Sequence, residues 1–162
     1  MADIRIRDYE GSDAENLNRL AVAAFGQFHD HYQDWPAMLA GLSKTSDLSA
    51  TGEIIIAEHQ HAFAGAVAYF GPKRRKAPFF DQSWPIIRML VVDPAFRGKG
   101  IGLALTNECI ARAKRDGSPL IALHTSPIMT VALPMYLRMG FVKAYDAPPI
   151  HGVAYAVYTK AL

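Results

Sequence analysis

The sequence predicts a single α/β domain spanning residues 1–162, and three observations carry this prediction. Hydrophobic residues make up 51% and charged residues 20% of the 162, which is ordinary for a globular chain. Short apolar runs of strand type alternate with segments whose apolar residues recur at helical spacing. No repeat, linker or low-complexity tract divides the chain. A domain of this size buries about 70% of its unfolded surface, so its core needs no disulfide. The lone Cys109 lies among Leu105, Ile110 and Ala113 at helical spacing, and we expect it to be a small core residue.

The first half of the chain predicts a strand, two helices and a hairpin. Ile4 and Ile6 alternate with arginines as in a strand, and residues 12–25 carry apolar side chains at helical spacing. A proline at position 36 suits the start of a short helix. The hairpin is expected over residues 53–58 and 62–69, followed by a loop over residues 71–83.

The second half predicts strands separated by helical segments. These are a strand over 86–92, a helix over 100–115 closed by Asp116-Gly117, a strand over 120–124, a helical segment over 125–139, and strands over 142–144 and 153–158. Pro134 lies inside the helical segment and removes one backbone donor, so a kink or a late start is expected there.

The segment Arg-Gly-Lys-Gly-Ile-Gly, residues 97–102, lies between a predicted strand and a predicted helix. The first N–H groups of a helix lack intrahelical partners and its dipole is positive there, so phosphate oxygens bind well. Gly98, Gly100 and Gly102 can take positive φ and let the backbone approach a ligand, while Arg97 and Lys99 add positive charge. This pattern predicts a site for a pyrophosphate.

Two other phosphate loops fit the spacing poorly. A P-loop requires Gly-Lys-Ser/Thr, but Lys99 is followed by Gly100. A dinucleotide fingerprint, Gly-x-Gly-x-x-Gly, would need its third glycine where Leu103 or Leu105 stands. The ATPase and nicotinamide interpretations are therefore disfavoured.

The spacing Arg-x-x-Gly-x-Gly, formed by Arg97, Gly100 and Gly102, resembles the acyl-CoA pyrophosphate loop of the GNAT (Gcn5-related) N-acetyltransferase superfamily. A second segment, residues 133–141, is similar to that family's Leu-Tyr-x-x-x-Gly-Phe pattern, with Ala132 at the expected small position. The two linked motifs make the resemblance specific, and it covers nearly the whole chain.

The resemblance implies a mixed, mostly antiparallel sheet of about seven strands flanked by about four helices and splayed between strands four and five. Acetyl-CoA, the implied co-substrate, would wedge into the splay. The backbone of Leu90, Val91 and Val92 would pair with the pantetheine arm like an added strand. The implied pyrophosphate contacts come from Arg97, Gly98, Lys99, Gly100, Ile101 and Gly102.

The reaction that the family implies is direct transfer of an acetyl group to an amine, without a covalent acyl-enzyme. Tyr136 matches the family tyrosine that protonates the departing thiolate, and its phenol, with an ordinary pKa of about 10, is protonated at neutral pH. The backbone N–H of Leu90 or Val91, at a bulge expected in the fourth strand, would stabilise the oxyanion.

The chain departs from the family at two positions. Ile86 stands where many relatives have a glutamate base, and Met129 stands where an asparagine contacts the CoA arm, so that contact is missing or supplied by Ser126. His124, on the fifth strand, is the first candidate for the base. Asp81, Glu58, His31 and a water chain remain open.

The missing glutamate bears on the acceptor. Deprotonating a lysine-like amine of pKa about 10.4 at pH 7 costs about 4.6 kcal/mol, whereas an α-amine of pKa near 8 costs about 1.4 kcal/mol. A weak base therefore favours a small-molecule or peptide α-amine acceptor. The alternative is a non-catalytic acyl-CoA-binding or sensor module, which would keep the loop and lack the acid and base.

Other partners are not expected. Residues 73–76, Lys-Arg-Arg-Lys, form one short basic run in a chain of net charge +2, so we predict a solvated loop and no nucleic-acid partner. Contact of this run with an acidic substrate or with the CoA 3′-phosphate stays open. His29, Asp30 and His31 are too few for a metal site, and no metal is expected. One cysteine and no long apolar run predict a cytoplasmic protein without a membrane span. Homodimers are common in the family and stay open.

Overall fold

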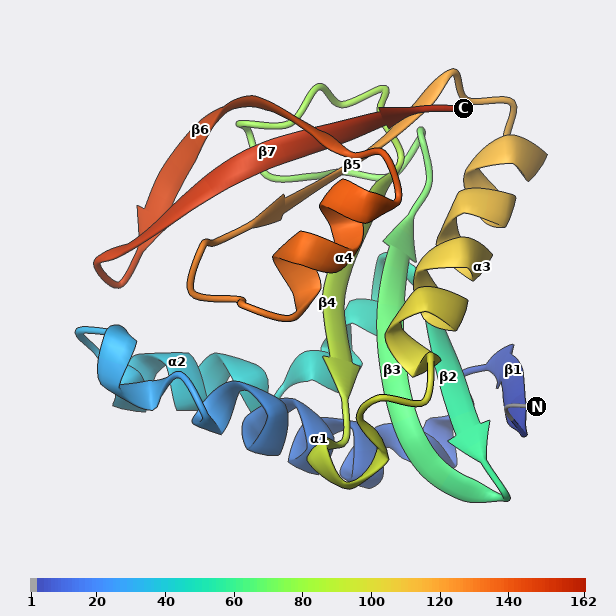
Figure 1. Ribbon diagram of the computed structural model, residues 1–162, viewed down its shortest axis with the longest axis vertical. Helices are drawn as coiled ribbons and strands as arrows, with labels where there is room; N and C mark the ends of the chain where they lie inside the picture. Colours follow the sequence, from blue (N-terminus) through green and yellow to red (C-terminus); the bar gives the residue numbers. More distant parts are fainter. Residues whose placement is uncertain (1–2) are drawn as a thin grey trace.

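The computed structural model describes residues 3–162 and contains one seven-stranded sheet of order β1-β2-β3-β4-β5-β7-β6. The strands are β1 (Ile4–Asp8), β2 (Glu53–His59), β3 (Ala62–Phe70), β4 (Ile86–Val92), β5 (Leu120–Thr125), β6 (Val142–Ile150) and β7 (Val153–Ala161). All neighbours are antiparallel except β4 and β5, which are parallel and in register only at Ile86 and Ala122. Figure 1 shows β5, β7 and β6 fanning away from β4, with α4 in front of the opening. The predicted splay is confirmed.

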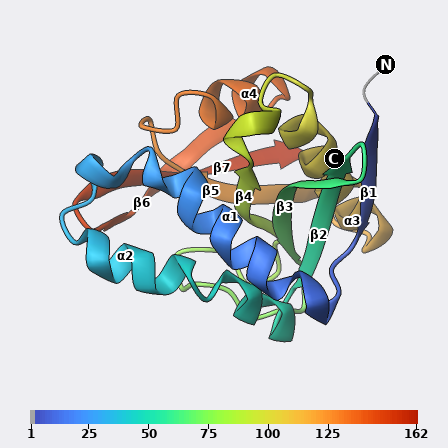
Figure 2. The ribbon, with the colours of Figure 1, turned by 90° about the horizontal axis from the view of Figure 1, so that it is seen from below.

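Four α-helices form within residues 3–162: α1 (Ala14–Gly26), α2 (Trp35–Leu42), α3 (Ile101–Arg115) and α4 (Ala132–Arg138). Short 3₁₀ turns cover Gly11–Asp13, His29–His31, Thr45–Ala50 and Pro94–Phe96. Helices α1 and α2 pack on one face of the sheet, and α3 and α4 pack on the other (Figure 2). The sheet is therefore the middle of three layers.

Alternating side chains along the central strands supply both cores. Ile86 packs toward α1 and α2, and Ile87 packs toward α3 and α4. Helix α3 buries Ile101, Leu105 and Cys109. Cys109 is 0% exposed, as expected for a core residue, and burial raises the pKa of its thiol.

One of two expectations about element boundaries is confirmed and the other was wrong. Helix α4 has the late start that Pro134 predicts: it begins at Ala132, because a proline fits only the first turn of a helix and Pro134 occupies that turn. Residues 126–131 form an irregular loop instead. Strand β6 continues to Ile150 rather than ending at Ala144. Its two prolines, Pro148 and Pro149, are tolerated because β6 lies at the edge of the sheet.

The loop between β3 and β4 is not simply a solvated basic run. Lys76 is only 8% exposed, and its ammonium donates hydrogen bonds to the carbonyl oxygens of Gly71 (2.7 Å), Arg74 (2.6 Å) and Gln82 (3.1 Å). Lys73, Arg74 and Arg75 are exposed. One lysine of the run therefore holds the loop together from inside, and only the other three residues match the prediction.

Candidate active site

A β-bulge in β4 shapes the site. Ala66 and Ala68 of β3 are opposite Val91 and Arg88 of β4, so β4 contains one extra residue in this interval. Met89 lies there with φ of 57°, a left-handed conformation that is unusual for a non-glycine residue. Met89 packs toward α1 and α2, whereas the next residue, Leu90, packs toward α3 and α4. Leu90 lines both of the cavities at this site, and Met89 lines one of them.

Two cavities adjoin at this bulge. The first has a volume of about 620 Å³ and the second about 370 Å³, both within the range of about 300–1,000 Å³ typical of ligand sites. Phe25, Leu90, Met129 and Ala132 line both of them. The two cavities therefore lie side by side with shared walls.

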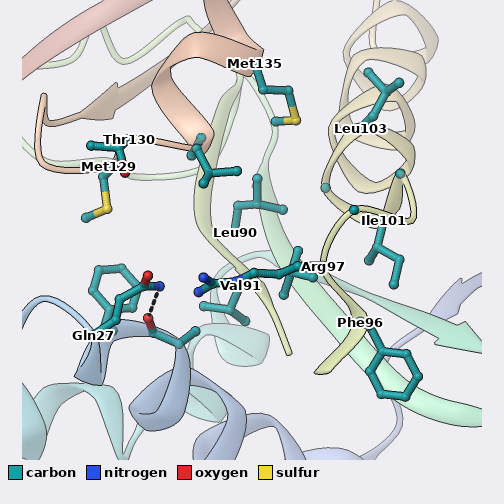
Figure 3. Close-up of a pocket in the computed structure, with 18 of the residues that line it drawn as sticks. Gln27, Leu90, Val91, Phe96, Arg97, Ile101, Leu103, Met129, Thr130 and Met135 are labelled. Atoms are coloured by element: carbon teal, nitrogen blue, oxygen red, sulfur yellow. Dashed lines mark hydrogen bonds between the residues drawn. The ribbon is translucent and has the colours of Figure 1, made fainter. Parts of the chain in front are cut away.

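The glycine-rich loop forms one end of the first cavity (Figure 3). Gly98 and Gly100 have φ of 74° and 82°, and Gly100 is the N-cap of α3. A Cβ at either position would meet no atom within 4 Å, so these positions require glycine for backbone conformation rather than for lack of room. Gly102 instead lies within α3, and its Cβ would be 3.5 Å from the sulfur of Met135.

Positive charge enters the first cavity from two sides. Arg97 lines it, and in Figure 3 its guanidinium extends across the cavity in the direction of Gln27. Arg138, on α4, also lines the cavity. Sequence reasoning did not single out Arg138, although it lies inside the second motif. Lys99 is exposed and does not line either cavity.

The remaining residues predicted to bind the cofactor divide into two groups. Leu90, Val91, Val92, Gly98, Gly100, Ile101 and Gly102 line the first cavity. Ser126 lines neither cavity: it is 1% exposed, and its hydroxyl accepts a hydrogen bond from the Ile128 N–H at 3.3 Å. Ser126 therefore holds the turn that leads to the cavity-lining residues Met129 and Thr130.

Tyr136 lines the second cavity from α4. Its ring packs edge-on against Phe141, with centroids 5.6 Å apart, and the residue is 5% exposed. Burial raises the pKa of the phenol. Tyr136 is therefore protonated at neutral pH and able to donate a proton or a hydrogen bond.

His124 lines the same cavity and is enclosed by aromatic rings. The ring centroids of Phe79, Phe80 and Tyr155 lie 5.2, 5.6 and 5.3 Å from that of His124. Its Nδ1 is buried without a hydrogen-bond partner. Burial, and then the charge of Arg88, lower the pKa of His124 to about 4. The imidazole is therefore neutral at pH 7.

The other base candidates lie outside the second cavity. Glu58 pairs with Arg7 at 3.1 Å on β2. Asp81 is exposed and accepts hydrogen bonds from Ser83, and His31 is exposed in a 3₁₀ turn. The structure thus brings only His124 of these candidates beside Tyr136.

Sequence reasoning missed three basic residues of the second cavity: Lys44, Arg88 and His151. Arg88 could have been identified from the sequence, because it is the one charged residue in the apolar run of β4. Lys44 and His151 reach the cavity only through the packing of distant segments, for which the sequence contains no local pattern.

Within residues 3–162, no group of three or more His, Cys, Asp or Glu side chains is arranged to hold a metal ion. No helix in the same range combines the length and apolar character needed to cross a bilayer.

Comparisons with known proteins agree with this geometry. Over its full length the chain is similar to a GCN5-related N-acetyltransferase from Rhodopseudomonas palustris, with 23% identity, 98% of that chain covered and a TM-score of 0.78. A GNAT family acetyltransferase from Elizabethkingia anophelis, solved with acetyl-CoA bound, is 18% identical over 99% of both chains with a TM-score of 0.68.

A curated relative gives a shorter match. An uncharacterized N-acetyltransferase of Methanocaldococcus jannaschii is 42% identical over 55 residues, which are 34% of this chain; the match spans 24% of the relative's length. The sequence model of the Acetyltransferase (GNAT) family matches residues 14–141, a range that includes the glycine-rich loop, the bulged β4 and Tyr136. By this match and by its fold, the chain belongs to the acetyltransferase (GNAT) family.

Proposed function

We propose that the protein is an N-acetyltransferase that moves an acetyl group from acetyl-CoA directly to the amine of a small molecule or to an α-amino group. The observation that carries the proposal is the meeting of the two cavities at the bulge of β4. One cavity has an anion loop, and the other has Tyr136 and His124. A structural relative with bound acetyl-CoA supports the choice of donor.

The first cavity suits acetyl-CoA in its charges and shape. The pyrophosphate would accept hydrogen bonds from backbone N–H groups at the start of α3, beside Arg97 and Arg138. Lys99 would add charge at the exposed rim. The pantetheine arm would pair with β4 at residues 90–92, where β4 parts from β5 and leaves backbone groups free.

The chemistry follows from this placement. The amine nitrogen attacks the acetyl carbonyl carbon, and the backbone N–H of Leu90 or Val91 at the bulge stabilises the oxyanion. The C–S bond then breaks, and the phenol of Tyr136 donates its proton to the thiolate. The products are an N-acetylated amine and free CoA thiol.

Removal of the proton from the acceptor amine is the step for which the site offers only a weak base. His124, with its pKa lowered to about 4, is too weak a base to deprotonate a free ammonium group. It can accept the proton once attack on the carbonyl makes the nitrogen acidic. The acceptor must then arrive as a free amine, which favours an α-amine over a lysine-like amine by about 3 kcal/mol at pH 7. A cytoplasmic location and homodimer formation stay predictions.

The test is release of free thiol from acetyl-CoA with a panel of amino acids, polyamines, aminoglycosides and peptide N-termini. Calorimetry of acetyl-CoA binding serves as the control for a folded, competent protein. Release that requires one class of amine supports the enzyme. Tight acetyl-CoA binding without release for any amine contradicts it and favours the non-catalytic sensor module.

A further inference from the structure

Arg88 occupies a position in the second cavity that the transfer reaction does not use. Ile86 and Ala122 are the one registered pair between β4 and β5. Arg88 and His124 each lie two residues further along, so they are on the same face of the sheet where the two strands part. Both line the second cavity.

Among residues 3–162, no acidic side chain forms an ion pair with the guanidinium of Arg88. Burial is the sole cause acting on its pKa, and it lowers that pKa. Other arginines of the chain that are largely enclosed are paired: Arg7 with Asp13 at 2.8 Å, and Arg112 with Glu53 at 2.9 Å. Arg88 differs from these two: its side chain is exposed, and it lines the second cavity, where the surrounding protein lowers its pKa. An unpaired guanidinium in a cavity can bind an anionic ligand.

The other ionisable residues that line the second cavity also favour an anionic ligand. Its ionisable lining residues, apart from tyrosines, are Lys44, Arg88, His124 and His151, and the lining includes no Asp or Glu. A ligand with only an ammonium group would therefore meet no compensating charge there. The other walls are largely apolar and include Met38, Leu42, Leu48 and Ile150.

We propose that the acceptor is an α-amino acid with an apolar side chain, whose carboxylate is bound by Arg88. This inference rests on the proposed acetyl transfer and names its substrate class. The planar guanidinium matches a carboxylate in two parallel hydrogen bonds. The apolar walls accept the side chain, and the α-amine lies near His124, toward the first cavity, which would hold acetyl-CoA.

The positive charges of the second cavity also favour the reactive form of the acceptor amine. Neighbouring cations disfavour the ammonium form and shift the bound amine toward its free form. In the reaction, the nitrogen bonds to the acetyl carbon and the C–S bond breaks. The amine loses one proton through His124 to solvent, and the thiolate gains one from Tyr136, which solvent reprotonates. The products are an N-acetyl amino acid and CoA thiol.

The experiment compares amines with and without a carboxylate, and each kcat/KM is expressed per concentration of free amine because the amine pKa also differs between them. L-leucine, L-leucinamide and 3-methylbutylamine are tested in thiol release, and the comparison is repeated with phenylalanine and its two analogues. The wild-type protein, Arg88→Gln, Arg88→Lys and the matched control Arg75→Gln are compared. Arg75 is exposed in the loop between β3 and β4 and lines neither cavity, so its substitution removes one charge elsewhere.

The expected result is a kcat/KM for the amino acid about tenfold to a hundredfold above that for its amide, since a hydrogen-bonded charge pair is being removed. Arg88→Gln is expected to abolish that preference, because it should lower kcat/KM for the amino acid far more than kcat/KM for 3-methylbutylamine. Arg88→Lys should keep part of the preference, and Arg75→Gln all of it. Equal rates on acids and amides, or an equal loss on all amines in Arg88→Gln, would overturn the proposal.

A binding measurement separates this inference from the proposed function. Calorimetry with leucine, phenylalanine and their amides, in the presence of CoA, needs no turnover. If acetyl transfer fails for every amine but the acids bind at least tenfold more tightly than the amides, and only when Arg88 is present, the carboxylate site stands and the transferase does not. If neither acid binds more tightly than its amide, the carboxylate site is refuted even where transfer is observed.

Discussion

Arg88 and His124 face one cavity from the two strands that part beyond Ile86 and Ala122, and the charge of Arg88 helps to lower the pKa of His124. Burial is the larger cause of the lowered pKa and the charge of Arg88 the smaller one, and together they keep neutral a histidine whose Nδ1 is buried without a partner. A neutral imidazole beside a fixed cation can accept a proton only transiently, which limits which amines can react.

The lowered pKa of His124 predicts a specific loss of stability in acid. Between pH 6.5 and about 4 the unfolded chain binds a proton that the folded chain does not, so stability falls as pH falls through this window. At pH 4 this uptake of a proton by the unfolded chain lowers the free energy of unfolding by about 3 kcal/mol relative to pH 7. His124→Gln removes the titrating group, so between pH 7 and pH 4 the wild type should lose about 3 kcal/mol more urea-unfolding free energy than the variant. Parallel curves from pH 4 to 7 would contradict the lowered pKa.

The same pKa predicts the shape of the pH–rate profile. We expect kcat/KM to rise with pH according to the pKa of the acceptor amine, without an inflection near 6.5, because His124 does not titrate there. Profiles measured with two acceptors whose amine pKa values differ by about 2 units should be displaced by the same amount. A common inflection near 6.5 for both acceptors would indicate a base with an ordinary histidine pKa.

Tyr136→Phe tests the general acid. Loss of the hydroxyl should lower kcat about a hundredfold, while acetyl-CoA affinity stays the same, since the phenol protonates only the leaving thiolate. The matched control is Tyr9→Phe, because Tyr9 lies outside both cavities. Unchanged turnover in Tyr136→Phe would make this tyrosine a packing residue.

Gly100→Ala tests the anion loop. Gly100 has φ of 82°, where an L-residue is strained by about 1–2 kcal/mol. The backbone should move away from the helical start, and acetyl-CoA binding measured by calorimetry should weaken about tenfold. Gly11→Ala is the control, because a Cβ there meets no atom within 4 Å and its φ is not positive. Equal affinities in the two variants would argue against a phosphate at this loop.

Lys76→Met tests the internal support of the loop between β3 and β4. The variant leaves three carbonyl oxygens without their donor and should lower the free energy of unfolding by about 2 kcal/mol. Because the loop carries Phe79 and Phe80 onto His124, activity should fall as well. The exposed Lys73→Met should change stability by less than about 0.5 kcal/mol in the same denaturant titration.

The splay between the fourth and fifth strands followed from the family resemblance that two motifs carry, because a glycine-rich strand–loop–helix junction leaves a local pattern in the sequence. The sequence predicted Cys109 in the core from helical spacing alone. It did not predict Lys76 as a buried donor, since a basic run looks solvated until the loop closes around it. Lys44, Arg88 and His151 meet in one cavity only because α2, β4 and the β6–β7 turn converge there. That convergence is tertiary and has no signature in the local sequence.

The most direct measurement is mass spectrometry of the acceptor, quantified against free thiol in the same reaction with acetyl-CoA. Our account predicts one N-acetylated amine formed for each thiol released, at a rate that saturates with acceptor and falls about a hundredfold in Tyr136→Phe. Bound acetyl-CoA with neither thiol nor acetylated amine, across amino acids, small amines and peptide N-termini, would contradict the account and leave an acyl-CoA-binding module.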